Sequence, residues 1–283
     1  MMRRILGESV RGYTHIQREL ECQDSKDSLV LEDGTVILSV ADGHGSRSCP
    51  YSRLGAELAT KTFCALADGL CHGFQKRQDR LSDYLNHEGS LRFAQEVERA
   101  WKGDVLHCHR TLGRDIPLTE AGAENEAAVY RLYGTTLLGL VIARDFVFAF
   151  QIGDGDITYV DGGGSQPVVQ ADKLLGVESH SLCSADAWKR AVSAVHFRDR
   201  AQKEPYAFLL STDGFSNSYA DGAAFGETCR QYFEALITYG PDAVAENLPE
   251  WLSETSRLGC GDDTTLLIAY FAPGEETNKE EIQ

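Results

Sequence analysis

The chain has 283 residues, enough for one large domain or two small ones, and 42% of them are hydrophobic, which is enough for a sizeable core. The formal net charge of −16 argues against a nucleic-acid partner, because binding to phosphate backbones requires a basic surface. No apolar stretch has the length of a membrane span or a secretion signal, so we expect neither. The eight cysteines show neither a C-x-x-C pair nor zinc-type spacing, so we expect reduced thiols in a cytoplasmic protein.

A β-hairpin is the first element that the sequence predicts. Residues 27–42, DSLVLEDGTVILSVAD, form two apolar runs around Asp33-Gly34, which is the strongest short-range signal for a hairpin. Residues 51–70 then carry leucine and alanine at helical spacing, and we expect this helix to end near Gly69.

A second helix is predicted over residues 90–112, whereas residues 118–130 are polar and small and predict a loop. The apolar residues of the helix recur at the spacing of one helix face. They are Leu91, Ala94, Val97, Trp101, Val105 and Leu112.

The middle of the chain is rich in predicted strands. Residues 134–164 contain three short apolar runs separated by turn residues, a spacing typical of antiparallel meanders and too short for β-α-β crossovers. Residues 171–205 show only a weak pattern, which suggests a surface excursion beside the main sheet.

The C-terminal part predicts a strand, two helices and a final strand. Residues 206–218, YAFLLSTDGFSNS, read as a strand that stops on Asp-Gly. Residues 225–237 and 242–256 have helical patterns, the second interrupted or ended near Pro249. Residues 264–272, TTLLIAYFA, form the last predicted strand.

These elements predict one α+β domain over residues 1–272, in which long amphipathic helices lie on antiparallel sheets. Residues 273–283 are expected to form a solvated acidic tail. No stretch resembles a linker, and no internal repeat stands out.

An acidic side chain recurs at the ends of the predicted strands, beside small residues. A single Asp-Gly at such a place is an ordinary turn. If the strands pair as antiparallel neighbours, however, four or five of these carboxylates gather at one rim of the sheets. The acidic residues concerned are Asp24, Asp42, Asp154, Asp213, Asp262 and Asp263.

Clustered carboxylates repel one another unless they are protonated, solvated or bound to a metal. An all-oxygen ligand set suits a hard cation, Mg²⁺ or Mn²⁺, and two such ions about 3.5–4 Å apart share and activate a bridging water and clamp phosphate oxygens. Ca²⁺ is less favoured because the chain has no EF-hand loop. The chain also lacks a P-loop, a complete G-x-G-x-x-G motif and a G-x-S-x-G elbow.

Four ordered motifs resemble the metal-dependent protein phosphatases of the protein phosphatase 2C type, particularly a bacterial branch. The motifs are CQD, ADGHG, GTT…IGDGD and STDGF…DDTT, and they span residues 22–265. The resemblance implies a central antiparallel β-sandwich flanked by helices on both sides, an αββα four-layer fold with a two-metal site at one end. It also implies hydrolysis of phosphoserine or phosphothreonine in a phosphorylated protein substrate.

The same resemblance assigns roles to single residues. Asp42 would bridge the two metals, Gly43 would offer its carbonyl, and Asp213 with Asp262 would hold one ion. Asp24 would hold waters on the other ion, and Asp154 occupies the position of an additional, weaker metal. His44 would lie beside the leaving oxygen, where an imidazolium supplies the proton that an expelled alkoxide needs. At the last motif Asp263 stays an alternative to Asp262, and the spacing to Thr265 favours Asp262.

Some positions depart from the family pattern. The residue before Asp24 is Gln23, where many members have Glu, and the position of the usual phosphate-binding Arg is Glu19. We therefore consider Arg18 and His15 as substrate-binding candidates, with Arg11 further upstream. Asn217 stands where a second acidic ligand of the weaker metal is usual, so a third ion is expected to bind poorly.

Three functions follow from these observations. The first is a Mg²⁺- or Mn²⁺-dependent serine/threonine phosphatase that acts through a metal-activated water and no covalent phosphoenzyme, and which we expect to be a monomer. The second is a phosphatase-like binding module without turnover, which Gln23 and the missing Arg favour. The third is a hydrolase of small phosphates or nucleotides. By analogy with the family, residues 171–205 are expected to form a flap that influences substrate choice.

Overall fold

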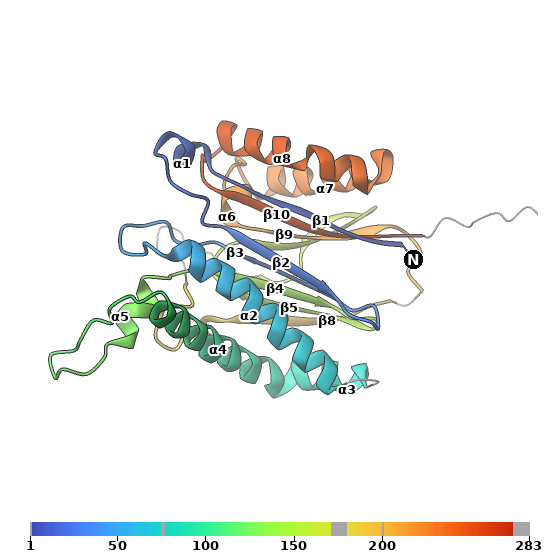
Figure 1. The fold of residues 1–283 in the computed structure, drawn as a ribbon. Coiled ribbons are helices and arrows are strands. Elements are labelled where there is room, and N and C mark those ends of the chain that lie inside the picture. The colour runs from blue at the N-terminus through green and yellow to red at the C-terminus, as the bar shows by residue number, and fades with distance from the viewer. Residues whose placement is uncertain (1, 75–76, 171–179, 200, 274–283) are drawn as a thin grey trace, which may run out of the picture.

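The structure, a computed structural model, describes residues 2–74, 77–170, 180–199 and 201–273. Its strands form two antiparallel five-stranded sheets (Figure 1). In order across the first sheet, the strands are β1 (Met2–Val10), β10 (Thr264–Ala272), β9 (Tyr206–Ser211), β6 (Asp156–Asp161) and β7 (Gly164–Pro167). In the second sheet they are β2 (Ser25–Val30), β3 (Val36–Ala41), β4 (Leu137–Ile142), β5 (Phe146–Ile152) and β8 (Val192–Phe197).

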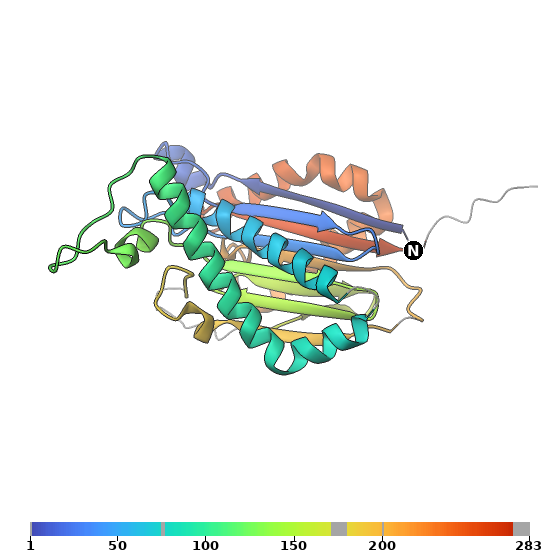
Figure 2. The same cartoon turned by 60° about the horizontal axis from the view of Figure 1, so that its bottom comes forward.

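Helices cover the outer face of each sheet. In Figures 1 and 2, α7 (Gly222–Tyr239) and α8 (Pro241–Leu258) lie over the first sheet, and α2 (Ser52–Gly73) and α4 (Ser90–Thr111) lie over the second. The shorter helical elements are α1 (Tyr13–Gln17), α3 (Gln78–Tyr84), the π-helical turn η1 (Leu85–Gly89), α5 (Glu126–Arg131), the 3₁₀ turn η2 (Ala187–Arg190) and α6 (Asp213–Ser216). This four-layer arrangement confirms the predicted α+β sandwich with helices on both sides.

The central strands are buried along their whole length and mostly apolar, because both of their faces are covered. Every residue of β3, β4, β5, β9 and β10 is buried. Successive side chains point to opposite faces of the sheet. Ile37 packs toward the helices, and its neighbour Leu38 packs between the two sheets. Strands buried on both faces lose the polar alternation of surface strands and read as continuous apolar runs.

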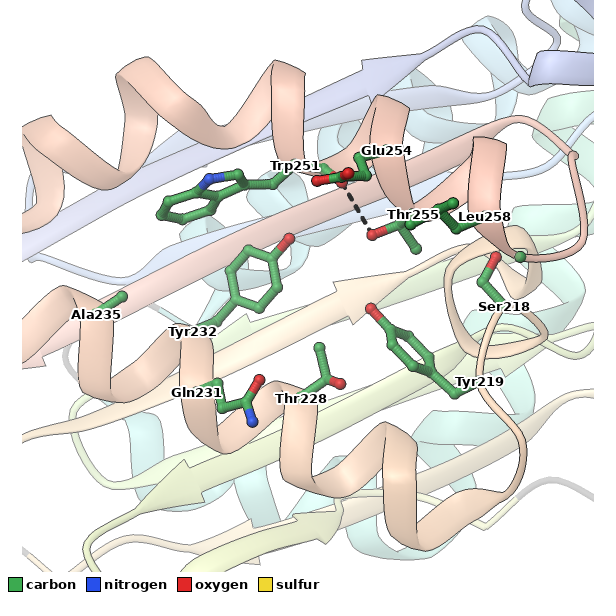
Figure 3. Close-up of a pocket in the computed structure, with 11 residues that line it drawn as sticks. Ser218, Tyr219, Thr228, Gln231, Tyr232, Ala235, Trp251, Glu254, Thr255 and Leu258 are labelled. Atoms are coloured by element: carbon green, nitrogen blue, oxygen red, sulfur yellow. Dashed lines mark hydrogen bonds between the residues drawn. The ribbon is translucent and has the colours of Figure 1, made fainter.

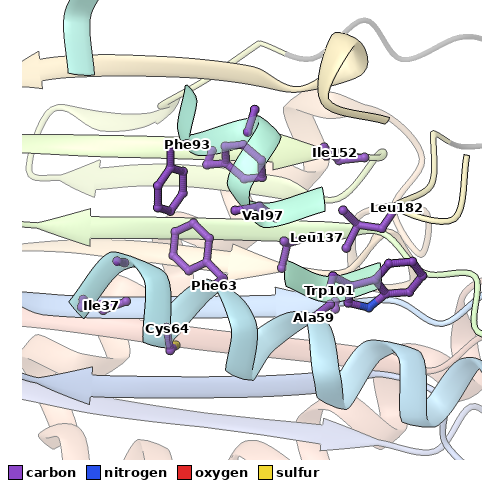
Figure 4. Close-up of a cluster of buried hydrophobic side chains, with 14 of the residues drawn as sticks. Ile37, Ala59, Phe63, Cys64, Phe93, Val97, Trp101, Leu137, Ile152 and Leu182 are labelled. Atoms are coloured by element: carbon purple, nitrogen blue, oxygen red, sulfur yellow. The ribbon is translucent and has the colours of Figure 1, made fainter. Parts of the chain in front are cut away.

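Aromatic side chains fill the layer between the second sheet and its helices (Figure 4). Phe63 of α2 and Phe93 of α4 meet edge to face, with ring centroids 5.6 Å apart. The fully buried Trp101 of α4 donates from Nε1 to the carbonyl of Gly55 in α2, at 2.9 Å. These two contacts join α2 to α4 over the second sheet.

The predicted helices over residues 51–70 and 90–112 are present, with two differences. The helix α2 continues through Gly69 to Gly73. On α4, Leu91 and Leu112 are exposed and Phe93 is buried, so the predicted apolar face was wrong at its two ends. Leu91 lies outside the stripe that packs on the sheet, and Leu112 is the residue at which the helix ends.

Two local predictions were wrong. The region 118–130 is not entirely loop, because α5 begins at Glu126, where the Asn125 side chain accepts a hydrogen bond from the amide of Ala128 at 3.1 Å. The helix α8 is neither interrupted nor ended at Pro249. A proline removes one hydrogen bond from a helix, and the burial of the apolar face of α8 against the sheet outweighs that loss.

The sequence pattern missed β1, β7 and β8, which are strands at sheet edges. β1 pairs along β10 from Met2↔Ala272 to Val10↔Thr264. β8 pairs with β5, so the second part of the predicted 171–205 excursion belongs to the sheet. Residues 171–179 and 274–283 lie outside the described residues, and the single domain over 1–272 stays a prediction. No helix in the described part of the chain combines the length and the apolarity needed to cross a bilayer.

Candidate metal centre and active site

The ends of strands from both sheets bring five of the six predicted acids to one cavity of about 210 Å³, and the sixth, Asp24, is not among the lining residues. Asp42 follows β3, Asp154 lies between β5 and β6, Asp213 begins α6 after β9, and Asp262 precedes β10. Antiparallel pairing places these positions at a shared edge, as expected. The cavity is lined by His15, Gln23, Asp42, Gly43, His44, Gly45, Thr136, Asp154, Asp213, Asp262 and Asp263.

The turn that carries Asp42 and His44 is held by the start of the neighbouring strand β4. The amide of Asp42 donates to Oγ1 of Thr136 at 2.9 Å, and the amide of Thr136 donates to the carbonyl of Asp42 at 2.8 Å. The amide of His44 donates to the carbonyl of Gly134 at 3.1 Å. The backbone of the turn is therefore fixed before any ligand binds.

Gly43 has no room for a side chain. A Cβ at this position would lie 2.7 Å from the carbonyl oxygen of Ser52 and 2.8 Å from that of Gln23. The Gly43 amide also donates to this Gln23 carbonyl, at 3.2 Å. The Asp-Gly pair is thus a turn, and the glycine is required because backbone approaches it closely.

Asp42 lies among other carboxylates. Burial raises the pKa of Asp42 well above its usual range, and the charges of Asp24, Asp213 and Asp262 raise it further. The side chains of Asp42 and Asp213 are close enough to share a hydrogen bond, which also raises the pKa of Asp42. A cluster of this kind favours either bound protons or a bound cation.

Asp24 is buried, and one of its oxygens is anchored. Its Oδ2 accepts hydrogen bonds from Oγ1 of Thr212 and from Oγ1 of Thr265, both at 2.7 Å. Its Oδ1 is buried and has no hydrogen-bond donor among the described residues. Burial raises the pKa of Asp24 well above its usual range. Neither threonine was predicted to act at the site, although both stand inside the STDGF and DDTT motifs.

Asp262 and Asp263, the two candidates at the last motif, differ in their surroundings. The carboxylate of buried Asp263 accepts from the amide of Gly12 at 2.6 Å and from the amide of Gln23 at 2.7 Å. Nδ1 of His15 lies 2.9 Å from Oδ1 of Asp263. Both residues line the cavity, but Asp263 ties the N-terminal segment to the site, whereas the Asp262 side chain is exposed.

The two substrate-binding candidates occupy different places. His15 lines the cavity but packs against Asp263, so its side chain also positions the acidic segment. Arg18 lines a neighbouring hollow of about 800 Å³, which shares Gln23 and Gly45 with the cavity. Arg47 lines the same hollow, although no sequence motif had indicated it as a substrate-binding candidate.

The residues present fit a divalent cation in their chemistry. Oδ1 of Asp24 and Oε1 of Gln23 are both buried and have no donor among the described residues, and an oxygen-binding ion would satisfy them. In the described part of the chain, no group of three His, Cys, Asp or Glu side chains is already arranged to hold an ion. The carboxylates would therefore draw together when an ion neutralises their repulsion.

A larger hollow of about 460 Å³ lies between α7 and α8, and its lining differs in character (Figure 3). Tyr219, Tyr232 and Trp251 face it, with Glu254 as the one carboxylate in the lining. Because this hollow has no paired acids, the chemistry predicted from the sequence belongs to the smaller, acid-lined cavity.

A family model described as Protein phosphatase 2C matches residues 11–253, and the chain therefore belongs to this family of protein phosphatases. This match confirms the prediction, made from the four ordered motifs, that the chain is of the protein phosphatase 2C type. A search of curated protein sequences finds no match.

Solved structures of bacterial phosphatases share the fold. The S. agalactiae serine/threonine phosphatase has a TM-score of 0.58 and 14% identity, with 95% of this chain and 99% of that chain covered. The catalytic domain of the phosphatase PstP, in complex with two manganese ions, has a TM-score of 0.55 and 19% identity, with 94% and 97% covered. PppA of Pseudomonas aeruginosa has a TM-score of 0.55 and 17% identity, with 96% and 99% covered.

Proposed function

We propose that this protein is a metal-dependent serine/threonine phosphatase that hydrolyses phosphoserine and phosphothreonine in proteins. The observation that carries the proposal is the buried carboxylate of Asp24, whose Oδ1 lacks a donor among the described residues beside the clustered Asp42 and Asp213. The manganese ions in the related PstP structure support the same chemistry.

Mg²⁺ or Mn²⁺ would be held by Asp24, Asp42, Asp213, Asp262 and the carbonyl of Gly43. When bound, two such ions supply an activated water and neutralise the phosphate charge. The carboxylates of this chain bind and orient, and the threonine hydroxyls keep Asp24 in one rotamer.

A third, weaker ion would depend on Asp154, which lines the same cavity. Its usual partner position is Asn217, whose Nδ2 donates to Oδ2 of Asp213 at 2.9 Å. An amide brings no charge to the ion and already uses Asp213 as its acceptor. We therefore propose that this third position is weak.

His44 is the proposed proton donor to the leaving oxygen. It lines the cavity, and its backbone is fixed by Gly134. A serine or threonine alkoxide is a poor leaving group, so protonation at its oxygen lowers the barrier. An aryl oxide leaves more easily and needs this proton less.

The hollow beside the cavity is the proposed place for the polypeptide around the phosphoresidue. Arg18 and Arg47 line it, and it shares Gln23 and Gly45 with the acid-lined cavity. Arg53 holds Glu21 of this hollow in an ion pair at 2.9 Å, which offsets one negative charge there. The arginines would bind phosphate or flanking acidic groups in place of the Arg that is absent at Glu19.

The cytoplasmic location and the monomeric state predicted from the sequence are also proposals.

A substrate panel tests this function. With Mn²⁺, we expect phosphate release from phosphothreonine and phosphoserine peptides and from an aryl phosphate, and little from nucleotides. Turnover of nucleotides alone would instead support the hydrolase of small phosphates. Stable ion binding without turnover of any substrate would support the binding module.

Replacing Gln23 by glutamate is expected to strengthen Mn²⁺ binding about fivefold to tenfold. The new carboxylate adds a charge beside Asp24, and an interaction of about 1 kcal/mol corresponds to such a factor. The same charge should make the metal-free protein less stable, because it adds to the repulsion. Titration calorimetry of the metal-stripped protein gives the affinity, with the exposed Gln17→Glu as the matched control. Unchanged affinity would show that Gln23 does not face the ion.

A further inference from the structure

Two thiols and the proposed proton donor surround the backbone of Gly134. A Cβ at position 134 would lie 2.7 Å from Cδ2 of His44, 3.2 Å from Sγ of Cys49 and 3.3 Å from Sγ of Cys183. The two sulfur atoms therefore face the same small space, which stays open only because residue 134 has no side chain. The imidazole of His44 borders this space as well.

The two cysteines come from segments far apart in the sequence. Cys49 lies in the loop that runs from the His44 turn to α2, and its amide donates to the carbonyl of Ser46 at 2.9 Å. Cys183 follows Leu182, whose amide donates to the carbonyl of Thr135 at 3.0 Å. A bond between the sulfurs would join these segments across Gly134.

Both thiols are reduced and only half-buried, so a small oxidant reaches them. Oγ of Ser181 donates to Sγ of Cys183 at 3.2 Å. Burial raises the pKa of the Cys183 thiol, and the charge of Cys49 adds to this effect. A thiol of raised pKa is the poorer first nucleophile, and Cys49 lines the hollow beside the acid-lined cavity, so the first step falls to Cys49.

We propose that Cys49 and Cys183 are a redox modification site, at which a hydroperoxide forms a reversible disulfide that switches the phosphatase off. The sulfur of Cys49 attacks the hydroperoxide, the O–O bond breaks, and a sulfenic acid and water (or an alcohol) form. The sulfur of Cys183 then displaces the sulfenic oxygen as water, and the S–S bond forms. Two thiols are oxidised and one hydroperoxide is reduced, and a dithiol reductant reverses the reaction.

The bridge acts on catalysis through His44. It would hold the 44–50 loop against the 181–184 segment and occupy the space that His44 borders. A displaced general acid loses contact with the leaving oxygen. This part of the inference rests on the proposed function, whereas the cross-link itself does not.

Mass spectrometry detects the cross-link directly. The full chain, with Mn²⁺ present, is treated with hydrogen peroxide, alkylated, and digested with trypsin without reduction. Peptides 48–53 and 174–189 each contain one cysteine, so their joined mass reports this bridge alone. We expect the joined peptide after oxidation, its loss with a dithiol, and its absence in Cys49→Ser and in Cys183→Ser. Cys108→Ser, which changes a half-buried cysteine of α4, should still form it.

Activity is followed in the same samples with a phosphothreonine peptide. We expect a fall of at least about tenfold on oxidation, recovery with the dithiol, and resistance in both serine variants. Absence of the joined peptide in the oxidised natural chain would overturn the modification site. The joined peptide with unchanged activity would overturn the switch. If the reduced protein releases no phosphate, the proposed function fails, and the mass experiment still decides whether the bridge forms.

Discussion

Replacing Asp42 by asparagine is expected to abolish phosphate release and, at the same time, to stabilise the metal-free protein. Activity should fall by at least about 10³-fold, because Asp42 would, under the proposed function, hold the ions that supply several kcal/mol of charge stabilisation. Stability should rise by about 1 kcal/mol, because the neutral amide removes a buried charge that Asp24, Asp213 and Asp262 repel. Loss of activity without loss of stability is the result expected when a metal ligand is replaced.

Thermal unfolding of the metal-stripped protein and initial rates with Mn²⁺ check both halves of this prediction. Glu250→Gln makes the same carboxylate-to-amide change at an exposed position of α8 and should alter neither quantity. Mn²⁺ should raise the unfolding temperature of the natural chain and of the control, and much less that of Asp42→Asn. A less stable but active Asp42→Asn variant would mean that Asp42 is structural.

The stabilising effect of Asp42→Asn should depend on pH in a defined direction. Burial, then neighbouring charge, raises the folded-state pKa of Asp42, while the unfolded carboxyl keeps its ordinary value near 4. The folded protein thus binds the proton more tightly, and its stability is lost as the pH rises through the raised pKa. The variant should gain least near pH 4 and most at pH 8 in metal-free buffer, measured as the difference in unfolding temperature. An equal gain at both values would show that this carboxyl is not perturbed.

Replacing His44 by alanine is expected to slow phosphothreonine peptides about 10²-fold and aryl phosphates much less. A positioned general acid contributes about 10²–10⁴-fold where the leaving group is poor. His44 is on a turn whose backbone is held by Gly134, so the truncation should leave the fold unchanged.

The ratio of the two rates is the measurement that isolates the proton transfer. The exposed His107→Ala on α4 serves as the histidine control and should change neither rate. Equal losses on both substrates would argue that His44 orients the phosphate and does not protonate the leaving oxygen.

The sequence alone predicted the strands that are buried on both of their faces. The runs at 36–41 and 264–272 are buried throughout and mostly apolar, because helices cover one side and a sheet covers the other. Edge strands carry a weaker signal, since one side of each edge has no strand partner. For that reason β1, β7 and β8 were missed, although each pairs along its whole length with a neighbouring strand. The edge strand β2 was predicted through the Asp33-Gly34 turn of its hairpin.

Local rules failed where tertiary packing outweighed them. Pro249 costs α8 one hydrogen bond, but Val244, Leu248 and Leu252 are buried on the face that packs against the first sheet. On α4, Phe93 is buried and Leu91 is not, because the geometry of the sheet decides which edge of an apolar stripe is covered.

At the site, the sequence indicated which acids converge but not how each is held. Strand ends and motif order predicted that Asp42, Asp213 and Asp262 meet, and they line one cavity, while their roles as ligands stay a prediction. The different roles of Asp262 and Asp263 depend on contacts with Gly12 and Gln23, which lie some 240 residues or more away along the chain. No local pattern contains such a contact, and the same is true of Arg47 beside Arg18 in the neighbouring hollow.

One titration tests the central claim, that the acid-lined cavity binds the ions on which phosphatase activity depends. Mn²⁺ is added to the metal-stripped protein while bound ion and phosphate release from a phosphothreonine peptide are measured in the same samples. We predict no release without metal, two ions bound tightly per chain, and a rate that rises as the second site fills. Release that persists in the metal-stripped protein, or two bound ions with no release, would contradict the account.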